Sequence, residues 1–297
     1  MTLPLESVPN FSEGRDPAAI ASIGTALSAH AKLLDVHTDV DHNRSVFTLV
    51  GDEGALVEAL LAGIACARDC IDLREHGGAH PRIGSADVVP IVPIVPSDME
   101  RACATALELG RRIGEELGLP VFLYGELAPD RGPAFFRRGG PEELQRRIDD
   151  GEVEPDFGPR ELHPAAGGVI VGARRPLIAF NVNLADANVE AAKTIARVIR
   201  ERDGGFPGVR ALGLEMLEAG HAQVSMNVEN WEASALHEIV AAIEREAAAL
   251  GVEVAGAELV GLMPAGAAAA AAGAALRIDG LDASRLLELR LLSNDRA

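Results

Sequence analysis

Residues 76–95, HGGAHPRIGSADVVPIVPIV, join a short glycine-rich segment to a long apolar run. The three glycines within 76–84 allow backbone angles that other residues avoid, so this segment is predicted to be a loop. The apolar run 86–95 is predicted to be a strand that is buried on both faces for part of its length. Pro90 and Pro93 cannot donate to a sheet ladder, which favours a place for this strand at or near the edge of its sheet.

The loop contains two histidines and an arginine. His80 precedes Pro81, whose ring favours extended backbone at the residue before it. His76 and Arg82 lie close in sequence, so the loop either takes part in proton transfer and substrate binding or forms a plain turn. The H-x3-H spacing is also found in metal sites, but such histidines share a face only in a helix, which the glycines and the proline oppose. We therefore expect no metal.

Composition narrows the class of protein. The 297 residues are 48% hydrophobic, enough for one or two domains with a large core. A formal net charge of -18 argues against a nucleic-acid partner, and an anionic ligand would need a locally cationic pocket. Cys66, Cys70 and Cys103 match no zinc or redox spacing and are typical of a reducing cytosol. We expect a cytoplasmic protein without signal peptide, transmembrane helix or membrane partner.

The same order of elements is predicted twice: strand, helix, strand, strand, helix, strand. This order is typical of the ferredoxin-like fold. We therefore predict the α+β class, with two tandem ferredoxin-like (βαββαβ) subdomains at 1–175 and 176–297, antiparallel sheets and helices packed on them. Between them, residues 126–166 are rich in glycine, proline and charge, with one short helix near 141–149. This segment is predicted to be a functional or mobile loop, too irregular to pack as a core layer.

Several motifs in this order together resemble the formiminotransferase domain family, and the likeness covers nearly the whole chain. They are VPNFSEG at 8–14, NR at 43–44, H-x-G-x-H-P-R-x-G at 76–84, D-V-x-P at 87–90, YGE at 124–126, PDFGP at 155–159, VGAR at 171–174, IAFN at 178–181, QVS at 223–225 and LVGL at 259–262.

The resemblance implies a fold, a reaction and a catalytic residue. The family moves a formimino group from N-formimino-L-glutamate to tetrahydrofolate in histidine breakdown, on two ferredoxin-like subdomains. His80, in the family's H-P-R motif, is then the catalytic residue, and we expect it to act as general acid and base. Tetrahydrofolate is expected as co-substrate. The family's folate loop falls on Gly158, Pro159, Arg160, Glu161, Leu162, His163, Pro164, Ala165, Ala166 and Gly167.

Further candidates for substrate binding follow from the chemistry of this reaction. Residues 32–50 are predicted to form a β-hairpin with its turn at 41–44. Because the amidine is cationic, a carboxylate of this hairpin, Asp39 or Asp41, is expected to orient it. Arg44 and Arg82 are expected to hold carboxylates of glutamate or of the folate tail, in a positive cleft with Arg160 or Arg174. The remaining candidates are Asn10, His42 and His76. For each of them the alternative is a structural role as a helix cap, a solvated turn or a surface ion pair.

Some positions depart from the family pattern. Many members have lysine and glutamate where this chain has Gly77 and Ala79, and an aromatic residue where it has Ala165 and Ala166. These departures favour one alternative, a folate-binding homologue without formimino transfer. A second alternative rests on the histidines and is a metal-dependent hydrolase using His76 and His80. The sequence also leaves open whether the group is formimino or formyl. We expect a homodimer without a fused cyclodeaminase domain.

Overall fold

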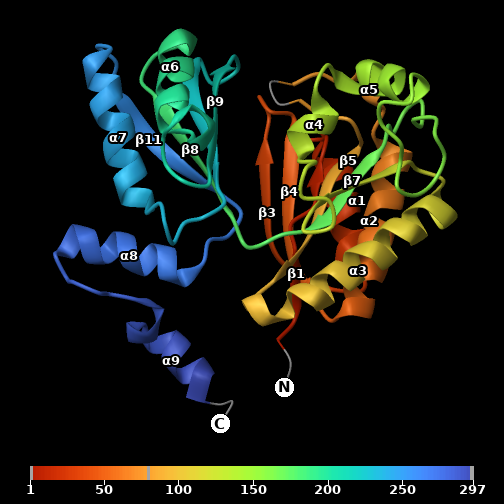
Figure 1. Cartoon of the computed structure of the whole chain (residues 1–297), viewed down its shortest axis with the longest axis horizontal. Coiled ribbons are helices and arrows are strands. Elements are labelled where there is room, and N and C mark those ends of the chain that lie inside the picture. The colour runs from red at the N-terminus through yellow and green to blue at the C-terminus, as the bar shows by residue number, and fades with distance from the viewer. Residues whose placement is uncertain (1–2, 79–80, 295–297) are drawn as a thin grey trace. The chain divides into compact units, whose positions relative to one another are not determined.

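The structure, a computed structural model, describes residues 3–78 and 81–294 (Figure 1). The chain forms two compact units, of which the first ends at Arg175 and the second begins at Pro176. Each unit has its own sheet with helices packed against it, which confirms the predicted α+β class.

The first unit begins with the predicted ferredoxin-like order. Its elements are β1 (Leu5–Ser7), β2 (Asn10–Phe11), α1 (Pro17–Ser28), β3 (Lys32–Asp39), β4 (Arg44–Gly51), α2 (Glu53–Cys70) and β5 (Ala86–Pro93). β1 and β2 are two pieces of one broken strand, because each pairs antiparallel with β4 and with β5. β3 pairs with the other side of β4. Asp16 and Asp52 cap α1 and α2 by accepting hydrogen bonds from backbone N–H groups, as expected at helix starts.

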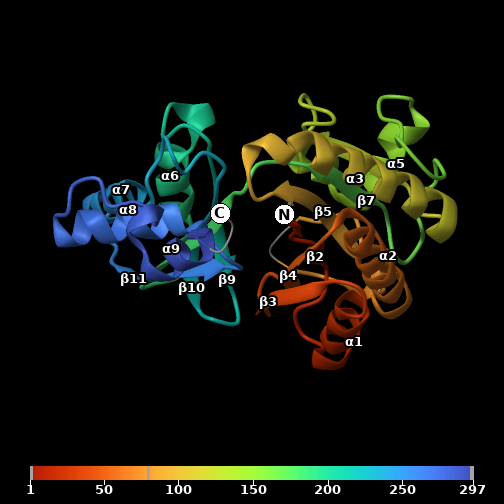
Figure 2. The same cartoon turned by 90° about the horizontal axis from the view of Figure 1, so that it is seen from below.

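Two further strands extend this sheet in parallel, which the predicted antiparallel pattern did not include. They are β6 (Val121–Gly125) and β7 (Val169–Ala173), and β7 lies between β5 and β6. The connection from β5 to β6 is the helix α3 (Met99–Arg112), since parallel strands need a crossover rather than a hairpin. The helices α1, α2 and α3 pack side by side (Figure 2).

Residues 86–93 form the predicted strand, but the prediction that it lies at or near the edge of its sheet is wrong. β5 lies inside the sheet, between the broken strand β1/β2 and β7. Pro90 is tolerated there because it lies between Val88, which pairs with Asn10 of β2, and Ile91, which pairs with Ser7 of β1. The missing N–H of the proline therefore meets the break between β1 and β2. The carbonyl of Pro90 accepts a hydrogen bond from Ser7 Oγ at 2.7 Å.

Residues 126–166 pack as a core layer, contrary to prediction. They contain α4 (Pro133–Arg137) and α5 (Gly140–Asp149), whose Phe136 and Leu144 are fully buried with Phe122 of β6. The PDFGP motif anchors this segment to β6. Asp156 accepts hydrogen bonds from Leu123 N at 2.8 Å and from Arg131 at 2.9 Å, and its own N–H binds the Val121 carbonyl.

The second unit is a four-stranded antiparallel sheet in the order β11-β8-β10-β9. This order and the sequence of elements are those of the predicted ferredoxin-like subdomain. Its elements are β8 (Ile178–Leu184), α6 (Val189–Ile199), β9 (Val209–Met216), β10 (His221–Val228), α7 (Leu236–Ala249) and β11 (Val254–Val260). A separate core forms between this sheet and α6 and α7.

The remaining elements are short or C-terminal. They are η1 (Leu73–Glu75), η2 (Pro96–Asp98), η3 (Ile113–Leu117, a π-helix), η4 (Glu201–Asp203), α8 (Ala265–Leu276), η5 (Ala283–Arg285) and α9 (Leu287–Asn294). In the described part of the chain, no helix combines the length and the apolar character that a membrane crossing requires.

The core layer under α4 and α5 can be tested by truncating Phe136. Because this side chain is 0% exposed, Phe136→Ala is expected to lower the free energy of unfolding by about 3–5 kcal/mol, measured by urea denaturation. The neighbouring Phe135 is 36% exposed, so Phe135→Ala is the matched control and is expected to cost clearly less. Equal losses for the two variants would contradict a packed layer at Phe136.

Candidate active site

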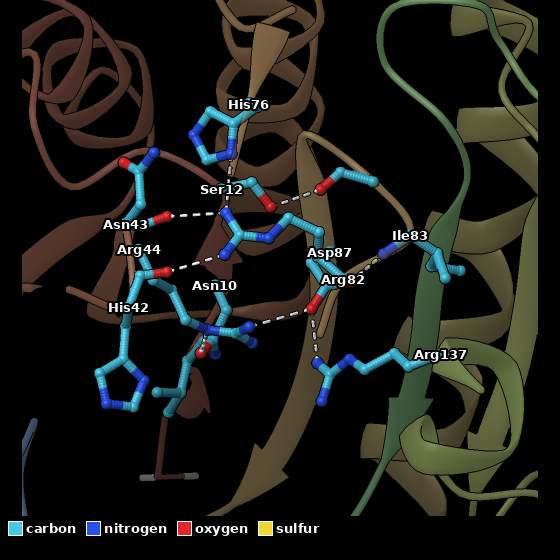
Figure 3. Close-up of polar contacts among 12 residues, drawn as sticks. Asn10, Ser12, His42, Asn43, Arg44, His76, Arg82, Ile83, Asp87 and Arg137 are labelled. Carbon is cyan, nitrogen blue, oxygen red and sulfur yellow. Dashed lines mark hydrogen bonds and ion pairs between the residues drawn. The ribbon is translucent and has the colours of Figure 1, made fainter. Parts of the chain in front are cut away.

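A buried carboxylate lies at the centre of the polar cluster drawn in Figure 3. Asn10 of β2 pairs with Val88, whereas Phe11 pairs with Ala86, so Asp87 is the extra residue of a β-bulge. A bulge re-aims a side chain, and the Asp87 side chain is 0% exposed beside the guanidinium groups of Arg44 and Arg137. The cluster depends on this irregularity of β5.

The Asp87 carboxylate joins three segments. Its Oδ1 accepts a hydrogen bond from Ile83 N at 2.8 Å. Its Oδ2 accepts from Arg44 Nη1 at 3.1 Å and from Arg137 Nη2 at 2.6 Å. Burial alone would raise the pKa of Asp87, but the two arginines and the Ile83 N–H outweigh it and hold the pKa below its usual value. Asp87 is therefore charged at neutral pH.

Arg44 is buried among other cations. Its Nε donates to Asn10 Oδ1 at 2.8 Å, and Asn10 Nδ2 in turn donates to the Val8 carbonyl at 2.9 Å. Burial, followed by repulsion from Arg137, lowers the pKa of Arg44 to about 9 although Asp87 opposes this shift. Arg44 stays cationic at neutral pH, so this part of a strongly acidic protein is locally positive.

Arg82 holds the histidine loop against the β3–β4 turn. Its guanidinium donates to the carbonyls of His42 at 2.8 Å and Asn43 at 3.0 Å, and lies 2.7 Å from His76 Nδ1. A guanidinium has only donors, so His76 Nδ1 is the acceptor of this contact. Burial and then the Arg82 charge lower the pKa of His76, which favours the neutral imidazole. A Cβ at Gly78 would lie 2.4 Å from both Arg82 Nη2 and the His42 carbonyl oxygen, so this approach requires glycine.

The β3–β4 turn is fixed by its own side chains. Asn43 has a positive φ of 45°, donates to the Gly77 carbonyl at 3.0 Å and accepts from Gly14 N at 2.9 Å. Asp39 Oδ1 accepts from His42 N at 2.7 Å, which holds this carboxylate in place at the turn. The turn, the first loop and the histidine loop therefore form one connected unit.

The second half of segment 158–167 is joined to the histidine loop through the backbone. Ser85 N donates to the Ala166 carbonyl at 2.9 Å, and Gly84 forms an isolated bridge with Gly167. His163 Nδ1 accepts from the N–H groups of Ala165 and Ala166. The Ala166 side chain is 1% exposed in the main core, so this residue can meet a ligand only through its backbone.

The first half of the segment contacts other parts of the unit. Gly158 has a positive φ of 80° and lies against the Leu119 carbonyl. Arg160 pairs with Glu154 at 2.9 Å and donates to the Ile148 carbonyl at 2.7 Å. Leu162 packs in the core under α5. Arg160 thus contacts other residues of segment 126–166 (the insertion). Its described contacts do not include Arg44 or Arg82.

The structure brings together five predicted residues, Asn10, His42, Arg44, His76 and Arg82, and reveals two further ones. His80 lies outside the described residues, as does Ala79. Asp87 was quoted only as a motif residue, although a carboxylate in an apolar run was a usable signal. Arg137 lies in no motif, so the sequence offered no signal for it.

The surroundings of His76 oppose a cation on one side of its ring. Within 3–78 and 81–294, no three histidine, cysteine, aspartate or glutamate side chains lie close enough to hold an ion. The Arg82 guanidinium occupies the Nδ1 side of His76 and would repel a cation there.

Both parts of the chain match models of one protein family. The formiminotransferase domain, N-terminal subdomain, matches residues 4–174, and the formiminotransferase domain matches 179–281. The chain is 41% identical to a glutamate formimidoyltransferase of Thermoplasma acidophilum over 97% of each chain. It is 42% identical to one of Streptococcus pyogenes, over 97% of this chain and 98% of that protein. A formimidoyltransferase-cyclodeaminase of Rattus norvegicus is 41% identical over 88% of this chain and 50% of its own length.

The Asp87 cluster can be tested through stability. Asp87→Asn leaves Arg44 and Arg137 buried without their counter-charge, so the free energy of unfolding is expected to fall on the order of 3 kcal/mol at pH 7. The folded pKa is depressed, so the contribution is present above the unfolded pKa of about 3.9 and is lost as the pH falls through the folded value. Urea denaturation of wild type and variant should therefore give a constant difference above about pH 5 that shrinks in more acidic buffer.

Glu190→Gln is the control for this measurement, because Glu190 forms an exposed ion pair with Lys193 in the second unit. Its removal is expected to leave stability unchanged within error. A difference between wild type and Asp87→Asn that does not vary with pH would contradict the charged state of Asp87.

Proposed function

This chain belongs to the formiminotransferase family, and from this we infer that it is a glutamate formimidoyltransferase. It transfers the formimino group of N-formimino-L-glutamate to N5 of tetrahydrofolate, giving 5-formiminotetrahydrofolate and glutamate. The observation that carries this conclusion is the identity of 41% and 42% to two glutamate formimidoyltransferases over 97% of the chain. Tetrahydrofolate is thus a substrate.

The reaction requires that the attacking nitrogen lose a proton and that the departing nitrogen gain one. N5 of tetrahydrofolate attacks the amidine carbon, and a tetrahedral intermediate forms. N5 then loses a proton, the glutamate nitrogen gains one, and the bond between that nitrogen and the carbon breaks. A single imidazole with a pKa near neutrality can perform both transfers, and we assign this role to His80.

The geometry of His76 supports its assignment to binding instead of proton transfer. Nδ1 of His76 faces the Arg82 guanidinium at 2.7 Å, and protonation there would place two cations in contact. Burial and the Arg82 charge also lower the pKa of His76, which disfavours its protonated form. His76 is therefore less suited than a freely titrating histidine to exchange protons near pH 7.

The substrates carry carboxylates, and the positive cluster suits them. We assign Arg44 and Arg82 to the electrostatic attraction of these anions, because their charges lie in a largely buried part of the first unit. The carboxylate of Asp39 is assigned to the orientation of the cationic amidine. Its hydrogen bond to His42 N fixes its direction in the turn.

Segment 158–167 is assigned to the pterin. Its backbone joins the histidine loop at Gly84 and Gly167, so a ring bound there would lie close to the residues after His80. Since Ala165 and Ala166 carry only methyl groups, we expect contacts with the ring to come from the backbone. Homodimer formation stays a prediction.

A turnover assay with N-formimino-L-glutamate and tetrahydrofolate tests the function and the histidine assignments together. His80→Ala is expected to lower kcat by about 10²- to 10⁴-fold while folate binding, measured by calorimetry, persists. His76→Ala is expected to lose less. His30→Ala, at an exposed histidine, is the matched control. Equal and small effects of the first two variants would refute the general acid/base assignment, and binding without turnover by the wild type would favour a folate-binding homologue.

Hydrogen exchange tests which loop meets which substrate. Folate is expected to protect amides of residues 158–167, because the pterin is assigned to this segment. Formiminoglutamate alone is expected to protect residues 76–84 instead. Helix α1 serves as the internal reference. Unchanged exchange at 158–167 in the presence of folate would remove the folate assignment of that segment.

A further inference from the structure

Arg137, at the end of α4, differs from the other arginines of the cluster in its hydrogen bonds. Arg44 uses Nε and Nη1 on Asn10 and Asp87, and Arg82 uses both terminal nitrogens on backbone carbonyls. Arg137 donates from Nη2 to Asp87 at 2.6 Å. Within the described part of the chain, neither Nε nor Nη1 of Arg137 has a hydrogen-bond partner.

The side chain of Arg137 is nevertheless held in place and still reaches the surface. Asp87 fixes the guanidinium through a short ion pair, and the side chain is 12% exposed. Phe136, the residue before it, is fully buried in the core of the insertion and anchors the end of α4. Figure 3 shows the guanidinium of Arg137 next to the Asp87 carboxylate, with its second terminal nitrogen directed away from it. The group is thus pre-oriented with donors remaining.

Such a group has a specific chemical complement. A buried donor without a partner is costly, so a ligand that supplies an acceptor is favoured. Arg44 and Arg82 add positive charge close by, since both influence each other and Arg137 electrostatically. The matching ligand group is an anionic oxygen such as that of a carboxylate, which accepts from Nη1, the terminal nitrogen directed away from Asp87 (Figure 3).

We propose that Arg137 binds a substrate carboxylate directly, as a specificity-determining residue supplied by the insertion. Asp87 holds the guanidinium in position, and Arg44 and Arg82 supply the surrounding charge. The carboxylate belongs either to formiminoglutamate or to the glutamate tail of tetrahydrofolate. This inference rests on the proposed function for the identity of the two substrates.

The test compares three variants in steady-state kinetics, with each substrate varied while the other is saturating. Arg137→Met is expected to raise the KM of one substrate on the order of 10- to 100-fold with a smaller change in kcat, because a charge-assisted hydrogen bond is lost. Arg137→Lys keeps the charge without the planar fork and should be intermediate. Arg138→Met removes the neighbouring exposed arginine and should behave as wild type.

Tetrahydropteroate, which lacks the glutamate tail, distinguishes the two sources of the carboxylate. If Arg137 binds the tail, Arg137→Met and wild type should handle tetrahydropteroate equally. If Arg137 binds formiminoglutamate, the variant should keep its defect with both folates. Unchanged KM values for both substrates in Arg137→Met, or an equal defect in Arg138→Met, would overturn the proposal.

Binding measurements separate this proposal from the proposed function and from a folding defect. Asp87 keeps its bonds to Arg44 and Ile83 in the Arg137 variants, so thermal melting should show a folded protein. Calorimetric titration with glutamate and with folate should show the loss for one ligand only, whether or not turnover occurs. A wild type that binds without turnover would refute the transferase, whereas equal binding by wild type and Arg137→Met would refute the role of Arg137.

Discussion

The first unit depends on one charged group that is removed from water. An isolated carboxylate inside a protein would take up a proton, but Asp87 has the Ile83 N–H and two guanidinium groups to hold its charge. The arginines come from β4 and from α4, segments far apart in sequence. The ion pairs therefore fix the insertion against the sheet on the polar side, while Phe136 and Leu144 fix it on the apolar side.

The same arrangement leaves the repulsion between its arginines only partly neutralised. Arg44, Arg82 and Arg137 repel one another, and burial prevents water from screening them, as the pKa of about 9 at Arg44 reflects. An anion entering the cluster relieves this repulsion, whereas a cation increases it. The first unit thus favours anions over cations before any contact with a particular substrate group is made. The acidic remainder of the protein does not remove this preference, because exposed charges further than about 8 Å away are screened at physiological ionic strength.

The sequence predicted what depends on local pattern and missed what depends on register. The order of strands and helices followed from periodicity, and Asp16 and Asp52 cap two helices at the position that aspartate favours. The role of Asp87 followed from a bulge between β2 and β5, which are far apart in the chain, so no local pattern contained it. Pro90 suggested an edge strand because the break between β1 and β2 could not be foreseen. Arg137 and the core beneath it were hidden in a segment whose composition resembles that of a loop.

The place of β7 has a consequence for how this protein reaches its fold. β7 is the last strand of its sheet in sequence, yet it lies between β5 and β6, with parallel partners on both sides. Until residues 126–166 have formed their layer, β5 and β6 each present an apolar strand edge without a partner. Parallel pairing over such a sequence separation is slow, and open edges of this kind pair readily with other chains. Aggregation during refolding is therefore expected to compete with the pairing of β7 between β5 and β6. Any condition that loosens residues 126–166 is expected to increase this aggregation.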